Sequence, residues 1–191
     1  MKPIATLILN RNLPKVTDKL YRTIKKNEGN ITDIFVIEAG SSKNNLSKYA
    51  TWYANSKSVK EKGLRFPRGM NYGLYNLWKE DLFNKYKAFF LITNDTVIQN
   101  KNTLKKLYRI ILKNKKIGIL SPCSKKWGEN KLLKKNSIKF SWYIHNHAYL
   151  LNKDFLLKII NPTSGYMNFL YDGSNFRGYG LESELIAKAY A

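Results

Sequence analysis

The sequence predicts an α/β domain over residues 1–191: a central, mostly parallel sheet with helices on both faces, in three layers. Short apolar runs alternate with longer segments whose apolar residues recur at helical spacing. The apolar runs lack the polar–apolar alternation of half-exposed strands, as is typical of strands buried on both faces. No repeat, low-complexity tract or linker divides the chain, so we expect a single domain, shortened at its C-terminus.

The first half of the chain reads as two buried strands, each followed by helical or irregular sequence. Val16, Leu20 and Ile24 share one face of the first helix, and Gly29 lies near its end. The predicted elements, in order, are a strand at 3–10, a helix at 13–30, a strand at 31–39, a short helix at 44–55, a loop at 58–69 and a helix at 70–83.

The second half continues the alternation. Leu104, Leu107, Tyr108, Ile111 and Leu112 mark an amphipathic helix. Residues 122–139 have the least pattern, and we expect a loop there. The predicted elements are a strand at 87–93, a helix at 102–114, strands at 116–122 and 141–152, and helices at 153–160 and 180–191.

Composition limits the classes of protein. An apolar content of 43% supports a sizeable core, and the apolar runs are too short to cross a membrane. The N-terminus does not read as a signal peptide. The single Cys123 excludes an internal disulfide and a cysteine zinc site, and a reducing cytoplasm is the expected setting. The net charge of +21 predicts attraction to polyanions, although the lysines are spread along the chain and an AT-rich codon bias would also explain them.

Polar clusters follow three of the predicted strands. In an open α/β sheet, ligands bind outside the carboxyl ends of the strands, so these clusters should converge. Two of the three contain a carboxylate, in a chain with only 13 acids. The alternative for Asp95 is a turn cap before the next helix. The clusters are Asn10 and Arg11, then Glu38, then Thr93, Asn94 and Asp95.

The chemistry of these clusters suits a nucleotide. Glu38 could accept hydrogen bonds from a ribose or a base edge. Neither of the glycine-rich phosphate-binding motifs, GxGxxG or the P-loop, is present. A single Asp95 beside amide and hydroxyl oxygens suits Mg²⁺ or Mn²⁺ held partly by a ligand's phosphates. Arg68 and Asn71 begin a helix, whose N-terminus favours anions.

Six segments, in order, resemble the nucleotide-sugar glycosyltransferases of the GT-A fold, especially the inverting family 2. The chain departs from that family at two points. Thr93 and Asn94 precede Asp95, so one acid of the usual metal motif is kept, and Glu182 stands where the family has a catalytic Asp. The segments are 5–24, 33–45, 68–78, 89–107, 147–159 and 178–190.

The resemblance implies a GT-A-like fold and transfer of a sugar, with inversion, from a nucleotide-diphosphate donor to a glycan or lipid-linked acceptor. It implies Glu182 as the catalytic base and Asp95 as the ligand of Mn²⁺ or Mg²⁺. The implied nucleotide-binding residues are Asn10, Arg11, Glu38, Arg68, Asn71, Thr93 and Asn94.

Further polar and aromatic residues are candidates for the acceptor or the phosphates. His145 and His147 alternate on the predicted strand at 141–152 and should point the same way. Asp172 could contact an acceptor, although its surroundings also read as a simple turn. Trp127 and Trp142 could stack on a sugar ring, or could be structural.

Two other classes remain open on sequence grounds. The charge of +21 would suit a nucleic-acid-binding protein, but no nucleic-acid motif is present and we expect no specific nucleic-acid partner. The reduced acid motif would suit a catalytically weak relative that binds nucleotide sugars or glycans. We expect a cytoplasmic protein with a peripheral contact at the anionic inner surface of the membrane.

Overall fold

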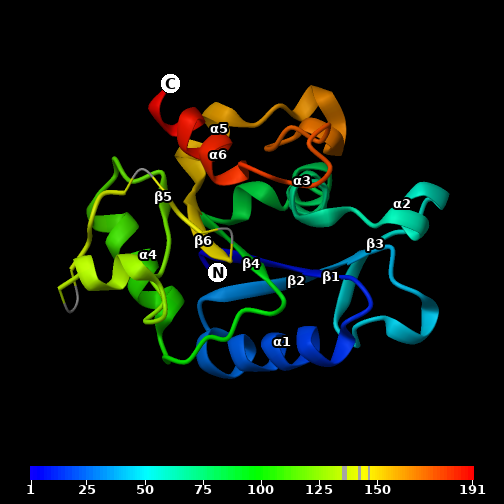
Figure 1. Cartoon of the computed structure of the whole chain (residues 1–191), viewed down its shortest axis with the longest axis horizontal. Coiled ribbons are helices and arrows are strands. Elements are labelled where there is room, and N and C mark those ends of the chain that lie inside the picture. Colours follow the sequence, from blue (N-terminus) through cyan, green and yellow to red (C-terminus); the bar gives the residue numbers. More distant parts are fainter. Residues whose placement is uncertain (135–136, 142, 146) are drawn as a thin grey trace.

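The chain folds around a six-stranded, mostly parallel sheet with helices on both faces, which confirms the predicted α/β class (Figure 1). The structure is a computed structural model. It describes residues 1–134, 137–141, 143–145 and 147–191.

The helices and strands are short and follow one another closely. In chain order they are β1 (Ile4–Asn10), α1 (Pro14–Glu28), β2 (Thr32–Ala39), η1 (Lys43–Asn45), β3 (Ala50–Ala54), α2 (Lys57–Lys62), α3 (Arg65–Lys79), η2 (Phe83–Lys85), β4 (Ala88–Thr93), α4 (Thr103–Lys113), β5 (Ile119–Leu120), η3 (Gly128–Leu132), β6 (Ala148–Asn152), α5 (Lys153–Ile159), η4 (Pro162–Asn168) and α6 (Leu181–Tyr190).

The strand order is β3-β2-β1-β4-β6-β5. β1 pairs in parallel with β2 and β4, and β2 pairs in parallel with β3. β6 runs antiparallel to β4 and to β5. The register places Asn10 beside Glu38 and Leu9 beside Thr93. The carboxyl ends of the three central strands therefore meet at one edge of the sheet.

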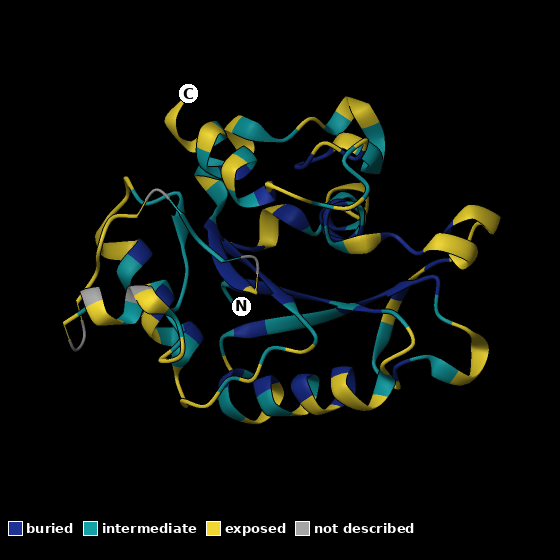
Figure 2. Ribbon diagram, in the orientation of Figure 1, coloured by how far each residue is buried: buried dark blue, intermediate teal, exposed yellow. Residues whose placement is uncertain are grey.

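Two apolar cores fill the spaces between the layers. On one face, Leu20 of α1 and Leu104 of α4 pack against the sheet. On the other face, Leu74 of α3, Leu156 of α5 and Leu185 of α6 do the same. Of the strands between them, β1, β4 and β6 are almost wholly buried (Figure 2). This burial on both faces explains why the central strands read as continuous apolar runs.

For helices α1 and α4, most of the residues that the sequence pattern predicts to be buried are buried, but those at the margins of the apolar face are not. On α1, Leu20 and Ile24 are buried, but Val16 is exposed. On α4, Leu104, Leu107 and Ile111 are buried, while Leu112 is exposed. The buried stripe is thus narrower than the sequence pattern suggests.

Helix α3 lies unusually close to the sheet because it presents glycine there. A Cβ atom at Gly73 would lie 2.4 Å from Cδ1 of Ile37 and 2.5 Å from Cδ2 of Leu7. Such overlap costs about 1–3 kcal/mol when the core must rearrange. The close approach brings the N-terminus of α3 to the carboxyl ends of β1 and β2.

Two predictions in the first half are wrong. Residues 44–55 are not a helix, because residues 50–54 form β3, in which Trp52 and Ala54 face the core and the residues between them face outward. Aromatic and β-branched residues fit such a half-buried strand. Residues 58–69 are not a loop, because α2 and the start of α3 occupy them. Pro67 is tolerated there in the first turn of a helix.

The strands of the second half are shorter than predicted. β5 contains only Ile119 and Leu120, and β6 begins at Ala148, so the prediction that His145 and His147 lie on a strand is wrong. Trp142, predicted to stack on a sugar, lies outside the described residues. Among the described residues, no helix is both long and apolar enough to span a membrane.

Candidate functional site at the carboxyl edge of the sheet

The end of β1 is closed by a buried amide whose hydrogen-bonding groups are all used within the protein. Asn10 is 0% exposed. Its Nδ2 donates to both carboxylate oxygens of Glu38, each at 3.0 Å, and to the carbonyl of Asn45 at 3.3 Å. Its Oδ1 accepts from the Leu13 N–H and from Oγ1 of Thr17. Asn10 therefore fixes the loops around the strand end.

Glu38, the carboxylate at the end of β2, is 1% exposed and is held by neutral donors. Besides Asn10, the N–H of Ser47 donates to its Oε1 at 2.7 Å. Oγ of Ser47 in turn donates to Oδ1 of the buried Asp18 at 2.5 Å. Among the described residues, Oε2 of Glu38 accepts a hydrogen bond from Asn10 alone and keeps capacity to accept another. A ligand contact at Glu38 would thus add to this network.

The network extends to the end of β4. Nδ2 of Asn94 donates to Oγ1 of Thr17 at 3.0 Å, and Thr17 donates to Asn10. Three strand ends and helix α1 are joined in this way. No sequence pattern marks Thr17, Asp18 or Ser47 as part of the site, because each lies in a segment that reads as ordinary helix or loop.

Asp95 follows β4 and is exposed. Among the described residues its carboxylate has no hydrogen bond or ion pair. Its neighbours are tied down instead: Oγ1 of Thr93 and Oγ1 of Thr96 lie 2.8 Å apart, and Thr96 donates to the carbonyl of His147 at 3.1 Å. The threonine hydroxyls of this turn are thus hydrogen-bonded within the protein, whereas the carboxylate of Asp95 is accessible to a ligand.

The two candidate arginines are anchored by carbonyl oxygens. Arg11 donates to the carbonyls of Glu61 and Lys62 at the end of α2. Arg68 donates through Nε to the carbonyl of Gly173 at 2.6 Å, and its guanidinium lies 4.8 Å from the ring centre of Phe176. Such a stacked cation is attracted to the ring face. Each guanidinium keeps further N–H groups that could meet a phosphate.

Asn71 has a structural role, because its side chain anchors residues 167–171 to helix α3. It is 0% exposed, and its Nδ2 donates to the carbonyls of Met167 and Tyr171. Its Oδ1 accepts from the N–H groups of Leu170 and Tyr171. All of its hydrogen-bonding capacity is used by residues 167–171, at the end of η4 and just after it, so a direct nucleotide contact would require these bonds to break.

The acids at the start of α6 differ in their surroundings. Oε1 of Glu184 accepts from the N–H of Asp172 at 2.9 Å and pairs with Lys188 at 2.7 Å. Glu182 is half-buried and has no hydrogen bond or ion pair among the described residues. A Cβ at Gly178 would lie 3.1 Å from Pro67, so the start of α6 lies against the start of α3. Glu182 is thus brought to the carboxyl edge of the sheet.

A pair of tyrosines lies beneath these acids. Tyr149 and Tyr171 are fully buried and hydrogen-bonded to each other through their hydroxyls. Burial raises the pKa of both phenols, and the negative charges of Glu182 and Glu184 add to the effect. Both hydroxyls are therefore protonated at neutral pH.

Hydrogen bonds from Ser174 lower the pKa of the exposed Asp172, which stays ionised.

Four rings gather next to the turn that contains Asp95. The ring centres of Trp127 and His145 are 3.9 Å apart, and those of Trp127 and His147 are 5.9 Å apart. Tyr143 meets His145 edge-on at 5.0 Å. Although the two histidines are not on a strand, they share this cluster. We call Trp127, Tyr143, His145 and His147 the ring cluster.

A divalent ion fits this edge only with help from a ligand. No group of three or more His, Cys, Asp or Glu side chains that could hold a metal occurs among residues 1–134, 137–141, 143–145 and 147–191. Mg²⁺ typically uses one or two carboxylates, with substrate phosphates and water as the other ligands. Asp95 supplies one accessible carboxylate, so the donor set suits an ion that arrives with a diphosphate.

Comparisons with known proteins show the fold. No protein-family model matches the chain, and no curated protein matches its sequence. The chain is similar to the mannosyltransferase PcManGT from Pyrobaculum calidifontis, solved with GDP-Man and Mn²⁺, at 8% identity and a TM-score of 0.57. That alignment covers 82% of this chain and 46% of the other, so the chain spans about half of that protein. A galactosyltransferase, LgtC, solved with donor and acceptor sugar analogs, aligns at 10% identity over 97% of this chain and 70% of its own, with a TM-score of 0.45. The fold is therefore GT-A-like.

Proposed function

We propose that this chain is the donor-binding, catalytic part of a nucleotide-sugar glycosyltransferase that works with Mn²⁺ or Mg²⁺. The observation that carries the proposal is the accessible carboxylate of Asp95 at the carboxyl edge of a GT-A-like sheet. The similar mannosyltransferase holds GDP-Man and Mn²⁺. The motifs in residues 178–190 and 89–107 support the same function and an inverting reaction.

In the proposed reaction, Glu182 takes the proton from an acceptor hydroxyl as that oxygen attacks the anomeric carbon. The bond from the anomeric carbon to the diphosphate breaks at the same time, and its electron pair leaves with the nucleoside diphosphate. General-base assistance of this kind contributes about 10²–10⁴ in rate. Glu182 suits the role because no described group neutralises it and because the start of α6 lies against the first turn of α3.

In this proposal, the residues at the three strand ends and at the start of α3 bind the donor. Asp95 would hold the divalent ion, which supplies positive charge to the leaving diphosphate. Arg11 and Arg68 have N–H groups left for phosphates. Oε2 of Glu38 has capacity to accept from a ribose or base. Asn10, Asn71, Thr93 and Asn94 contribute by fixing these elements in place, with direct contacts to the nucleotide still a prediction.

The acceptor side is assigned to the ring cluster and Asp172. Trp127 and His145 could stack on a sugar ring, and His147 could donate to a phosphate or hydroxyl. The acceptor is a glycan or a lipid-linked glycan.

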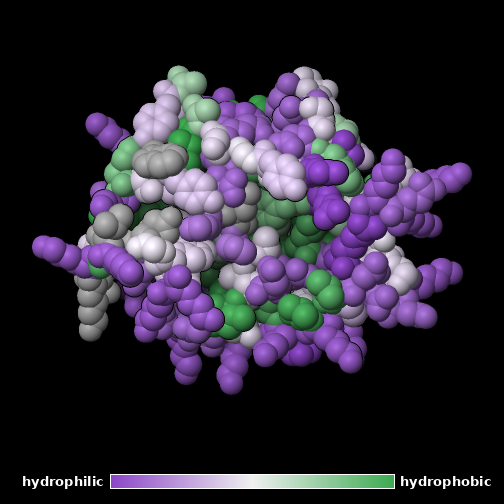
Figure 3. Space-filling view, in the orientation of Figure 1, coloured by the Kyte–Doolittle hydropathy of each residue, from purple (hydrophilic) through white to green (hydrophobic). Residues whose placement is uncertain are grey.

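We also propose a cytoplasmic location with a peripheral contact to an anionic membrane. Hydrophilic side chains project around most of the outline of the molecule (Figure 3), and the net charge of +21 would favour such a contact.

A thermal-shift screen of UDP-, GDP-, dTDP- and CMP-sugars, with Mn²⁺ or with EDTA, tests this function. A donor at a hundredfold excess over its dissociation constant stabilises the fold by about 2.7 kcal/mol. For a chain of this size that is a shift of roughly 5–10 °C. Tripolyphosphate is the matched control, because a charge of +21 attracts any polyanion. If no nucleotide sugar exceeds tripolyphosphate, the proposal is wrong.

A second function is favoured by one observation. Among the polar residues at the three strand ends, Asp95 is the one exposed carboxylate, and two of the candidate amides are saturated by protein groups. A protein that binds nucleotide sugars without transferring them would fit that arrangement. Release of free sugar from the donor that shifts the melting temperature separates the two functions, because a binder produces none above the rate in buffer.

A further inference from the structure

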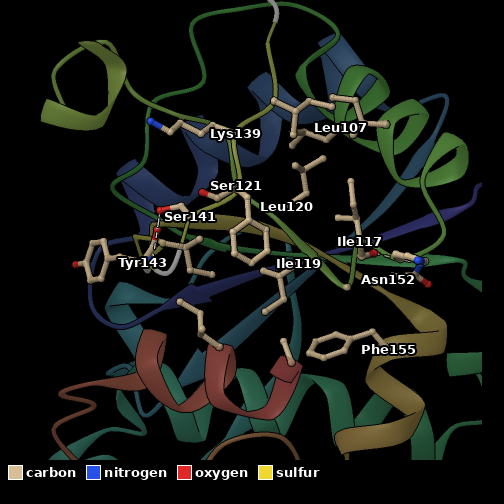
Figure 4. Close-up of a pocket in the computed structure, with 18 of the residues that line it drawn as sticks. Leu107, Ile117, Ile119, Leu120, Ser121, Lys139, Ser141, Tyr143, Asn152 and Phe155 are labelled. Carbon is tan, nitrogen blue, oxygen red and sulfur yellow. Dashed lines mark hydrogen bonds between the residues drawn. The ribbon is translucent and has the colours of Figure 1, made fainter. Parts of the chain in front are cut away.

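Beyond β5 the sheet edge opens into a large cavity between the two helical layers. Its volume is about 1460 Å³, above the roughly 300–1,000 Å³ of common small-molecule sites. The side chains of Ile119, Leu120 and Phe155 point into it, with α4 on one side and α6 on the other (Figure 4). Ile119 and Leu120 are only half-buried, whereas most residues of β1, β4 and β6 are buried. The cavity is thus an apolar space along an uncovered edge strand.

The mouth of this cavity combines exposed apolar groups with positive charge. Ile138, Phe140 and Tyr190 line it and are 53%, 78% and 63% exposed. The rings of Phe140 and Tyr190 meet edge-on, with their centres 6.0 Å apart. The cationic lining residues are Lys115, Lys116, Lys139, Lys158 and Lys188. Asp154 is the only acid among the described lining residues.

Most of these lysines are available to a ligand. Lys188 is paired with Glu184, but Lys115, Lys116, Lys139 and Lys158 are exposed and take part in no described ion pair. Apolar side chains at the surface, ringed by lysines, are typical of proteins that lie on an anionic membrane. A partner protein docked on this surface would have to supply acidic side chains for most of these lysines. An anionic lipid supplies both groups that the surface calls for, because its phosphate pairs with the lysines and its acyl chain can enter the apolar cavity.

We propose that this surface docks on a membrane and takes up an acyl chain of an anionic phospholipid, while the exposed Lys115, Lys116 and Lys139 around the cavity meet the anionic headgroups of the membrane. The proposal deepens the peripheral membrane contact named above and does not depend on donor chemistry. Trp127 and His145 of the ring cluster line the same cavity. Docking therefore places the acceptor side of the candidate site at the membrane surface, where a lipid-linked acceptor would be presented.

Vesicle binding tests the charge pattern. The protein is sedimented at about 0.15 M salt with vesicles of phosphatidylcholine, with or without 30% phosphatidylglycerol. The variant K115Q/K116Q/K139Q is compared with K19Q/K25Q/K26Q, which removes three exposed charges from α1. We expect about a fivefold loss of affinity for each lysine at the cavity, and a much smaller loss from α1. Equal losses in the two variants, or equal binding to both kinds of vesicle, would overturn the proposal.

Entry of the acyl chain is tested by fluorescence. Phosphatidylglycerol with brominated chains should quench Trp127, which lines the cavity, and the quenched fraction should fall in Trp127→Phe. Phe140→Ser, at an exposed position, should weaken binding that persists in high salt. If the parent binds anionic vesicles and Trp127 contributes no quenching, the cavity is not the lipid site. The donor thermal shift, measured without lipid, is unaffected by either result.

Discussion

Replacement of Asn71 tests whether this buried amide organises the site from behind. The change Asn71→Ala removes four hydrogen bonds, to two carbonyls and two N–H groups of residues 167–171. Each buried group left without a partner costs about 1–3 kcal/mol. The lower bound is therefore about 4 kcal/mol, or a fall in melting temperature of roughly 8–16 °C for a chain of this size.

The measurement is urea unfolding followed by circular dichroism, with Asn76→Ala as the control. Asn76 lies on the same helix and donates only to the carbonyl of Tyr72, one turn away. We expect its loss to cost less than about 1 kcal/mol. If Asn71→Ala is no more destabilising than Asn76→Ala, the four bonds do not support the fold. Asn71 would then be open to a direct ligand role.

Three further predictions concern catalysis, backbone geometry and pH. Glu182→Gln should lower the turnover number by about 10²–10⁴ while leaving the donor thermal shift unchanged, and unchanged turnover would remove Glu182 as the base. Gly40→Ala should destabilise strongly in urea unfolding, because φ is +85° there and a Cβ would lie 2.1 Å from a carbonyl oxygen of α2, whereas Gly128→Ala, with open space around it, should be neutral. The pKa values of Tyr149 and Tyr171 are raised in the folded state, so their contribution to stability is present below pH 10 and is lost as the pH rises above 10. The loss is up to about 1.4 kcal/mol per pH unit for each tyrosine. Replacing both with Phe should make the fall of the unfolding free energy above pH 10 less steep, and an unchanged slope would contradict the prediction.

The central strands could be predicted from sequence because burial on both faces leaves a simple signature. Residues 3–10, 31–39 and 87–93 are continuous apolar runs, and the structure places strands within one or two residues of each. The edge strands give weaker signals. β3 has only two buried side chains, and no apolar run marks it in the sequence. β5 lies within the strand predicted at 116–122 but contains only two residues.

The strand ends could be predicted, but the contacts there could not. Asp95 and Glu38 follow buried strands, and the topology brings those ends together. Glu38, a partner of Asn10, lies 28 residues away in the chain, and the partners of Asn71 lie 96 to 100 residues away, so no local pattern marks them. A sequence therefore indicates which polar residues reach the edge, but it does not show which of them are already bonded within the protein.

The role of Asp95 in binding a metal-bound donor is tested most directly by Asp95→Asn. The thermal shift produced by the best nucleotide sugar is measured over a series of Mn²⁺ concentrations, with Asp81→Asn as the control at an exposed acid at the far end of α3. The account predicts that Asp95→Asn folds normally and loses the Mn²⁺-dependent part of the shift, while Asp81→Asn keeps it. The same Mn²⁺ dependence in Asp95→Asn as in the parent would mean that Asp95 is only a turn residue, and would contradict the account.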